Sequence, residues 1–293
     1  MEGIRYLIVD VFCEEKLKGN QLAVFLDAGS LDGAAMQSLA REMNFSESTF
    51  ILDSRPNDKG WPVRIFTPRA EVPFAGHPTL GTSWVIAYEL LESRPASLTL
   101  DLRAGPIPVR FETDDAGELM WMTQNQPEFR EGPGVAAVAA ALGLDTTDID
   151  TRFPIERVST GLPFLLVPVV SLDGVQRARV RGEAYDALCA QDHKAIFFFT
   201  ADTVDAANEV HARMFADALG VPEDPATGSA NGCLAAWLVR HRYFGTSEID
   251  LTVEQGVEMG RASRLYLRAS ENQGTFSIQV GGRVIPVAEG RLR

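Results

Sequence analysis

The most informative stretch of the chain is Glu223-Asp-Pro-Ala-Thr-Gly-Ser-Ala-Asn-Gly-Cys-Leu-Ala-Ala-Trp-Leu-Val-Arg240. It predicts a loop that leads into a helix, because Asp224 and Pro225 are turn residues and an apolar run begins at Cys233. The first N–H groups of a helix have no partner within it, and the helix dipole adds positive charge there. The stretch is therefore a candidate anion site beside a carboxylate. Asp, Ser and Thr also cap helices, so an ordinary N-cap is the alternative.

A second stretch has the same layout, which indicates an internal repeat. Arg64-Ile-Phe66 precedes Val72-Pro-Phe-Ala-Gly-His-Pro-Thr-Leu-Gly-Thr-Ser-Trp-Val-Ile-Ala87, as Arg213-Met-Phe215 precedes Val221-Pro-Glu-Asp-Pro-Ala-Thr-Gly-Ser-Ala-Asn-Gly-Cys-Leu-Ala-Ala236. The separation of about 150 residues is the size of a whole domain, so two similar domains are predicted. If they face each other, two helix N-termini would oppose across a cleft, and clefts between domains are common ligand sites.

Composition limits the classes of function. The 293 residues are 45% hydrophobic and carry a net charge of −13, which argues against binding to nucleic acid or to anionic membranes. A small anionic substrate stays compatible with this charge, because backbone dipoles act locally. The three cysteines, Cys13, Cys189 and Cys233, have unrelated spacings and suggest reduced thiols in the cytoplasm. We expect neither a membrane span nor a signal peptide.

Apolar patterning outlines where each domain begins and ends. Residues 6–12 and 21–26 predict two paired strands, and the second stretch predicts a glycine loop over residues 73–81 and a helix that continues through residues 84–91. Residues 126–134 read as the crossover, which puts the first domain at 1–125 and the second at 126–282. The tail, 283–293, is expected to return to the first domain, because it would cover an exposed sheet edge there.

Two residues of the first domain are candidates for chemistry. Glu47 stands in an apolar, strand-like segment, where desolvation would raise the pKa of a carboxylate toward the range of a general acid/base. The alternative is that Glu47 points outward from a half-buried strand. His77 lies beside Gly76 at the entry to the predicted helix, at the repeat position of Ser229. A lone loop histidine is more commonly a solvated or hydrogen-bonding group, and the repeat favours a functional one.

The chain resembles the PhzF-like (phenazine-biosynthesis) isomerase family over essentially its whole length. The resemblance is carried by Gly19-Asn20, Met43-Asn-Phe-Ser-Glu-Ser-Thr-Phe50, Pro73-Phe-Ala-Gly-His-Pro-Thr-Leu-Gly-Thr82 and Glu223-Asp-Pro-Ala-Thr-Gly-Ser-Ala-Asn-Gly232. It implies an α+β, diaminopimelate-epimerase-like fold of two similar domains with a pseudo-two-fold relation. Each would be a barrel-like sheet around a central helix, with the active site between them. Gln21 is a departure, because the family usually has proline after Gly-Asn.

The resemblance also implies roles for individual residues. Glu47 would be the general acid/base that moves a proton between carbons of a small carboxylate-bearing substrate, similar to dihydro-hydroxyanthranilate. His77 and Asp224 would be assisting catalytic groups that fix the substrate and balance charge. The substrate-binding positions would be Ser46, Gly76, Gly228 and Ser229. No cofactor and no metal are implied, and a homodimer is expected.

Other classes of function fit the residues less well. Diaminopimelate epimerase and proline racemase use two thiols, one at each glycine loop, whereas this chain has Ala75 and Thr227 there, so an amino-acid epimerase or racemase is a weaker alternative. Ser229 lacks a nucleophile elbow, the chain has no dinucleotide fingerprint, and its histidines lack metal-ligand spacing. A non-catalytic binding or interaction protein on the same fold is the other alternative. Fold and motif do not identify the specific substrate.

Overall fold

The structure is a computed structural model that describes residues 3–293, and it divides into two compact units. Unit 1 comprises the chain up to Thr123 together with Gly281–Arg293, and unit 2 is Gln124–Val280. Each unit contains a mostly antiparallel sheet and a buried helix, which confirms the predicted α+β class. None of the helices in residues 3–293 has the length and apolar character that a bilayer span requires.

The sheet of unit 1 has the order β17-β1-β2-β3-β4-β6-β7-β8. The pairs β2–β3 and β4–β6 are parallel and the other pairs are antiparallel. Strand β17 comes from the end of the chain and pairs with β1, so the tail completes this sheet. The strands are β1 (Arg5–Val11), β2 (Asn20–Phe25), β3 (Glu47–Ile51), β4 (Trp61–Phe66), β5 (Glu71–Val72), β6 (Ser97–Leu102), β7 (Gly105–Asp114), β8 (Gly117–Thr123) and β17 (Val284–Arg291).

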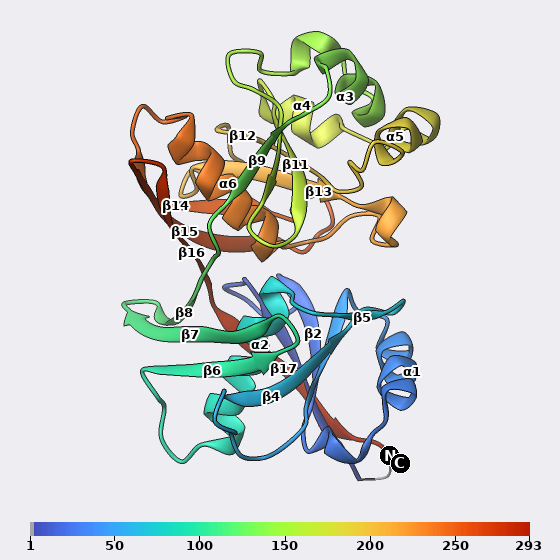
Figure 1. Ribbon diagram of the computed structural model, residues 1–293, viewed down its shortest axis with the longest axis vertical. Helices are drawn as coiled ribbons and strands as arrows, with labels where there is room; N and C mark the ends of the chain where they lie inside the picture. The colour runs from blue at the N-terminus through green and yellow to red at the C-terminus, as the bar shows by residue number, and fades with distance from the viewer. Residues whose placement is uncertain (1–2) are drawn as a thin grey trace. The chain divides into compact units, whose positions relative to one another are not determined.

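Helix α2 (Gly76–Val85) is the centre of unit 1, and every one of its residues is buried. It contacts β1, β2, β3, β6, β7, β8 and β17, and it continues as one π-helical segment, Ile86–Leu90 (Figure 1). The glycine loop predicted over residues 73–81 is helical from Gly76 onward. Gly76 and Gly81 lower helix propensity, whereas Pro78 lies in the first turn, where a helix tolerates proline. A side chain on Gly81 would place Cβ only 2.6 Å from Leu22 Cδ2. Packing therefore outweighs propensity at this helix.

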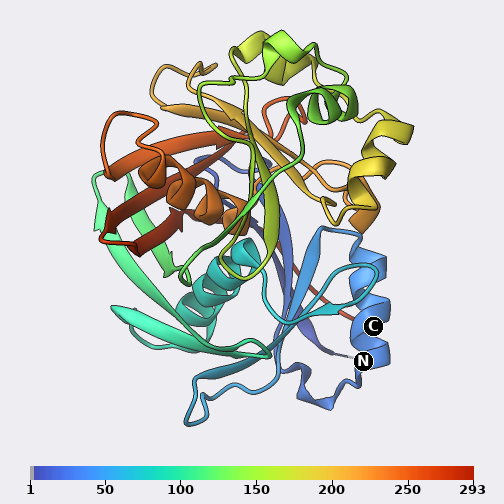
Figure 2. The ribbon, with the colours of Figure 1, turned by 45° about the horizontal axis from the view of Figure 1, so that its top comes forward.

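Helix α1 (Gly33–Met43) packs against β3 and β4 (Figure 2). Its buried residues join a separate apolar cluster with Phe25, Phe50 and Phe66. The helix begins at Asp32, whose side chain accepts a hydrogen bond of 2.8 Å from the Ala35 N–H. It ends at Asn44 in the left-handed conformation, and β3 starts soon afterwards. The end of α1 thus determines where Glu47 enters the sheet.

Unit 2 is built around helix α6 (Gly228–Arg240), which is buried up to Val239 and contacts β10, β11, β14 and β15. A second core lies between the strands and helices α3 (Val135–Leu142), α4 (Leu172–Arg177) and α5 (Gly182–Cys189). The crossover predicted at 126–134 contains a strand, β9, that was not predicted. The strands are β9 (Glu128–Glu131), β10 (Glu156–Ser159), β11 (Pro163–Pro168), β12 (Ile196–Thr200), β13 (Val210–Phe215), β14 (Glu248–Gln255), β15 (Ser263–Asn272) and β16 (Thr275–Gly282).

The two sheets share one topology, which extends the repeat beyond the matching motifs. The order β9-β10-β11-β12-β13-β14-β15 repeats the order β17-β1-β2-β3-β4-β6-β7, with parallel pairs at the same two places. The registers also correspond. Phe50 lies opposite Arg64 as Phe198 lies opposite Arg213. Counterpart positions in the two units can therefore be compared residue by residue.

The repeat also contains a matched ion pair. The Arg64 guanidinium donates to both carboxylate oxygens of Glu71 at 2.8 Å, and Arg213 does the same to Glu223 at 2.8 and 3.0 Å. This aligns Glu71 with Glu223. The motifs had suggested aligning Val72-Pro73 with Val221-Pro222, and the two alignments differ by three residues. The inserted residues therefore precede the glutamate, and Asp224 corresponds to Val72.

Candidate functional site

In unit 1, the start of β3 lies beside the start of α2. Glu47 is the first residue of β3 and shares a strand face with Thr49. The Thr82 hydroxyl of α2 donates a hydrogen bond of 2.8 Å to Thr49 Oγ1 and so fixes the helix against this strand. His77 Nδ1 then lies 3.6 Å from Glu47 Oε2, close but beyond hydrogen-bond distance. The Glu47 side chain is 20% exposed, so it neither points fully outward nor is sealed in the core.

The His77 imidazole is buried and neutral. Burial lowers its pKa to about 3, against a weaker opposite effect of the Gln21 backbone. Among the described residues, its Nε2 atom has no hydrogen-bond partner. A neutral imidazole does not offset the charge of a carboxylate in the resting protein, in contrast to the charge-balancing role we expected. It can still donate or accept one hydrogen bond with a substrate.

The substrate-binding positions predicted in unit 1 flank this pair. Ser46 is partly buried and immediately precedes β3, and Gly76 is the first residue of α2. Ala75 occupies the N-cap position, where its methyl side chain cannot accept a hydrogen bond. Helix α2 therefore begins without a side-chain cap, which is compatible with an anion at its first turn.

In unit 2, Asp224 and the start of α6 belong to one hydrogen-bonded loop. Asp224 is buried, and Thr227 Oγ1 donates to its Oδ2 at 2.6 Å. Thr227 occupies the N-cap position of α6, but its side chain makes no capping bond. Gly228 and Ser229 form the start of the helix, and both are buried. The N-cap alternative is thus not realised by Thr227, whose hydroxyl binds the carboxylate of Asp224 instead.

The counterpart positions of the two units carry different chemical groups. The shared register of Phe50 and Phe198 places Ala195 at the position of Glu47. Ser229 stands at the position of His77, and the aligned ion pairs place Val72 at the position of Asp224. The two units therefore have similar backbone structures, but they do not carry a symmetric pair of acid/base groups.

None of the three cysteines occupies the N-cap position of α2 or α6. Ala75 and Thr227 occupy the two N-cap positions, and all three cysteines are free thiols. Cys233 is buried inside α6, and this burial raises the pKa of its thiol to about 12, despite hydrogen bonds with Thr160 that lower it. A thiol with such a pKa is not a thiolate base at neutral pH.

A buried charge network in unit 2 was not predicted. His211 is fully buried between two carboxylates, with Nδ1 at 2.7 Å from Glu254 Oε1 and Nε2 at 3.0 Å from Glu258 Oε1. Glu254 also accepts hydrogen bonds from the backbone of Val204 and Asp205. The parallel pairing of β13 with β14 puts His211 opposite Glu254. The two residues are far apart in the sequence, so their spacing along the chain gave no sign of this contact. Within residues 3–293, no cluster of three or more His, Cys, Asp or Glu is arranged to hold a metal ion.

This network predicts how the stability of unit 2 depends on pH. Burial alone would lower the pKa of His211, but Glu254 and Glu258 raise it from 6.5 to about 8. The extra stability is therefore fully present below pH 6.5 and is lost as pH rises through about 8, by roughly 2 kcal/mol. Glu254 acts oppositely. Its pKa is lowered from 4.5 to about 2, so its contribution is present above pH 4.5 and lost as pH falls through 2.

The measurement is urea unfolding of the wild type and of His211→Gln between pH 6 and 9. The wild type should lose stability across this window, and the variant, which has no titrating imidazole there, should lose much less. Equal pH dependence in the two proteins would contradict the assignment to His211.

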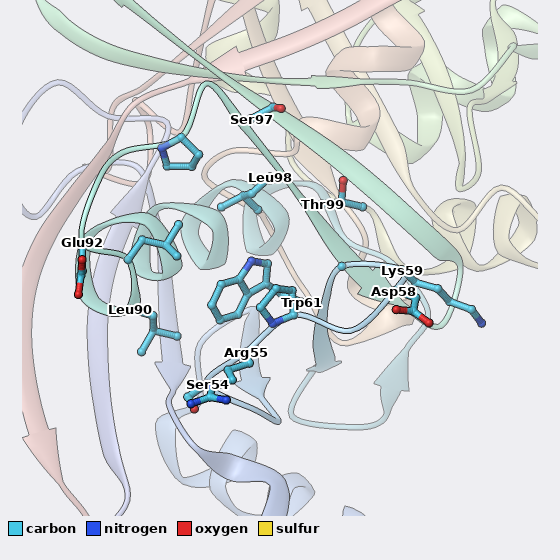
Figure 3. A pocket seen from close by; sticks show the side chains of 14 residues that line it. Ser54, Arg55, Asp58, Lys59, Trp61, Leu90, Glu92, Ser97, Leu98 and Thr99 are labelled. Atoms are coloured by element: carbon cyan, nitrogen blue, oxygen red, sulfur yellow. The ribbon is translucent and has the colours of Figure 1, made fainter.

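A surface pocket of about 790 Å³ lies on unit 1. It is formed by the turn before β4 and by the segment between the π-helical turn and β6. Figure 3 shows the Trp61 indole in the pocket, with Leu90 and Leu98 nearby. None of the predicted site residues lines it. Its size is within the range of small-molecule sites, but its lining contains neither Glu47 nor His77, and we assign it no role.

Comparison with known proteins identifies relatives along the whole chain. Residues 9–290 match the family model PhzC-PhzF, described as phenazine biosynthesis-like protein. A trans-2,3-dihydro-3-hydroxyanthranilate isomerase from Pseudomonas aeruginosa is 39% identical, and the match covers 98% of each chain. A PhzF-family protein from Bacillus anthracis has a TM-score of 0.91 at 28% identity, with full coverage of both chains.

More distant structures share the fold alone. A hydroxyproline epimerase from Agrobacterium vitis is similar with a TM-score of 0.60 at 13% identity, and the match covers 100% of this chain and 94% of the epimerase. Together with the Bacillus anthracis protein, it confirms the predicted diaminopimelate-epimerase-like fold.

Proposed function

Because the chain belongs to the phenazine biosynthesis-like family and is an isomerase of that family, we propose that it moves a proton between two carbons of a small carboxylate-bearing substrate. The substrate class is a dihydro-hydroxyanthranilate-like ring acid, as in the name of the Pseudomonas aeruginosa relative. The proposal includes a single general acid/base, Glu47, and no cofactor.

The observation that carries this mechanism is the asymmetry of the repeat. Glu47 lies beside a neutral His77, whereas the counterpart of Glu47 in unit 2 is Ala195. One carboxylate would then remove the proton from carbon while the electron pair of the broken C–H bond enters the conjugated system. The double bonds shift, the same carboxyl group returns the proton to another carbon, and a carboxylate is regenerated.

The other site residues would bind the substrate. His77 would form one hydrogen bond through its neutral imidazole, and the Asp224 carboxylate would accept one from an amino or hydroxyl group. The starts of α2 and α6, with Ser46, Gly76, Gly228 and Ser229, would bind the substrate carboxylate and stabilise developing negative charge. A symmetric amino-acid racemase is less well supported, because neither N-cap position carries a thiol.

The test is an isomerisation assay with trans-2,3-dihydro-3-hydroxyanthranilate, followed by chromatography of substrate and product. A panel of cyclic and α-amino carboxylates tests the substrate class, and each compound is also tested for thermal stabilisation of the protein. Turnover of a ring acid supports the proposal. Stabilisation by such a ligand without any turnover would replace it with the binding-protein alternative.

Cofactor independence gives a separate prediction. Dialysis against EDTA followed by gel filtration should leave kcat within about twofold of the untreated enzyme, because proton transfer by Glu47 requires no metal. The control is the untreated protein carried through the same column. A loss of activity that added divalent metal restores would contradict this part of the proposal.

We also propose a cytoplasmic homodimer, on the resemblance to the family and on the three free thiols. Sedimentation equilibrium over a range of concentrations would distinguish a dimer from a monomer.

A further inference from the structure

The side chain of Gln255, at the end of β14, is fully buried beneath the loop that carries Asp224. Its Nε2 donates to the Asp224 carbonyl at 2.8 Å and to Thr227 Oγ1 at 3.0 Å. Its Oε1 accepts from the Thr227 N–H and from Asn231 Nδ2, both at 3.1 Å. One amide group thus connects the loop, the N-cap residue and the first turn of α6.

These bonds have a defined direction. The Gln255 Nε2 group is only a donor, so Thr227 Oγ1 accepts from it and has its own proton left to donate. That proton goes to Asp224 Oδ2, 2.6 Å away. Successive hydrogen bonds of this kind polarise one another in a dry environment. The chain from Gln255 through Thr227 therefore holds the Asp224 carboxyl group in one orientation and as an acceptor.

Neighbouring groups fix the same loop from the same strand end. Ser263, which pairs with Gln255 in the sheet, donates from Oγ to the Pro225 carbonyl at 2.8 Å. Gly256 adopts a φ of +74°, and a Cβ there would lie 2.5 Å from the Pro225 carbonyl oxygen. The ends of β14 and β15 thus pack directly against the loop at Pro225, with no room for a side chain at position 256.

Unit 1 shows that the fold does not require this amide. Trp61 pairs with Leu100 as Val210 pairs with Val253, so the register places Leu102 at the position of Gln255. Leu102 is buried and apolar, and the N-cap residue of α2 is Ala75. One bond is common to both units: Thr79 Oγ1 donates to the Ala75 carbonyl as Asn231 Nδ2 donates to the Thr227 carbonyl. The glutamine occurs only where the loop carries an aspartate.

We propose that Gln255 is a positioning residue of the isomerase, which acts through Thr227 to hold the Asp224 carboxylate and the first turn of α6. This inference rests on the proposed function, since it assigns the loop a task in that reaction. It adds a residue that does not itself contact the substrate.

Two variants test the role by different means. Gln255→Leu introduces the residue of unit 1 and removes every bond of the amide. Gln255→Glu keeps the shape but replaces the donating NH₂ with an accepting oxygen, so Thr227 no longer has to donate to Asp224. Both should lower kcat/KM, by up to about 10²-fold, because small displacements of a positioned group have effects of this size. Thr227→Ser, which keeps the hydroxyl, should retain activity, and Thr227→Val should not.

The readout that separates positioning from general destabilisation is a double-mutant cycle with Asp224→Asn. If Gln255 acts through Asp224, Gln255→Leu should lower kcat/KM in the wild type and have little further effect in the Asp224→Asn protein. Thr252→Val is the matched control, because Thr252 lies on the same strand and its hydroxyl binds Asn208 and Glu209 instead. It should leave kcat/KM unchanged. Equal losses from Gln255→Leu in both backgrounds would overturn the inference.

Hydrogen exchange gives a readout that does not depend on activity. In Gln255→Leu the Thr227 amide loses its acceptor, so its exchange should be at least about tenfold faster than in the wild type and in Thr252→Val. Faster exchange of the Thr227 amide in a protein without isomerase activity would mean that Gln255 holds the loop but that the proposed function is wrong. Unchanged exchange and unchanged kcat/KM in an active enzyme would overturn the positioning role alone.

Discussion

Glu47→Gln will lower kcat by about 10²–10⁴-fold, the usual contribution of one positioned acid/base group, while the protein stays folded. The amide keeps the size of the side chain but cannot accept a proton from carbon. The Glu47 side chain is 20% exposed, so water can solvate the replacing amide, and the substitution should alter chemistry far more than stability. Steady-state kinetics and thermal unfolding of the same preparation measure both effects.

The matched control for Glu47 is Glu42→Gln, which neutralises an exposed carboxylate of α1 a short distance away in sequence. It should leave kcat unchanged, since no substrate group is expected near it. A Glu47→Gln protein with wild-type turnover on its true substrate would remove the basis of the mechanism.

Arg213→Met will have the largest effect on stability, a loss of about 3–5 kcal/mol in the free energy of unfolding, because breaking a buried ion pair leaves its partner charge uncompensated. The Arg213 side chain is only 3% exposed and binds both oxygens of Glu223. It also donates to the carbonyls of Val175, Gln176 and Ala178 at the end of α4. Methionine keeps the apolar stem but leaves these acceptors without their donor.

The repeat provides the control for Arg213. Arg64 forms the same bidentate pair with Glu71, but its side chain is 29% exposed. Solvent can replace the lost bonds there, so Arg64→Met should destabilise by only about 1 kcal/mol. Urea unfolding at neutral pH measures both variants. Equal losses of unfolding free energy in Arg213→Met and Arg64→Met would show that burial does not determine how much each ion pair stabilises the protein.

Arg213→Met should also affect the site, because Glu223 directly precedes Asp224. Where the variant is folded, kcat/KM should fall further than in Arg64→Met. A destabilised Arg213→Met protein with full activity would show that this ion pair does not support the loop.

Much of the fold could be predicted from the sequence because the repeat and the long motifs constrain each other. The start of α2 could not. Gly76, Pro78 and Gly81 have low helix propensity, and the crowding around Gly81 explains why a glycine is required inside this helix. Strand β9 could not be distinguished from a linker, because three of its four residues are charged and only Phe129 is apolar.

The sequence motifs yield candidate site residues, but they do not show the electrostatic environment of those residues. A loop histidine gives no sign in sequence that burial will keep it neutral, as it does for His77. Gln255 and His211 were missed for a related reason. Each is an ordinary polar residue in a strand. The partner of His211 becomes apparent from the pairing of β13 with β14, and the partners of Gln255 from the packing of the loop before α6 against the end of β14. The detailed roles of Glu47, Asp224 and their neighbours stay predictions.

The most direct test of Glu47-dependent proton transfer is NMR in D₂O of the protein with trans-2,3-dihydro-3-hydroxyanthranilate, run beside Glu47→Gln. The wild type should introduce deuterium at a ring carbon as the double bonds shift, because the carboxyl proton of the partly exposed Glu47 exchanges with D₂O before it returns to carbon. Glu47→Gln should introduce none on the same timescale. Equal deuterium incorporation by the two proteins, or wild-type product formation by Glu47→Gln, would contradict the account.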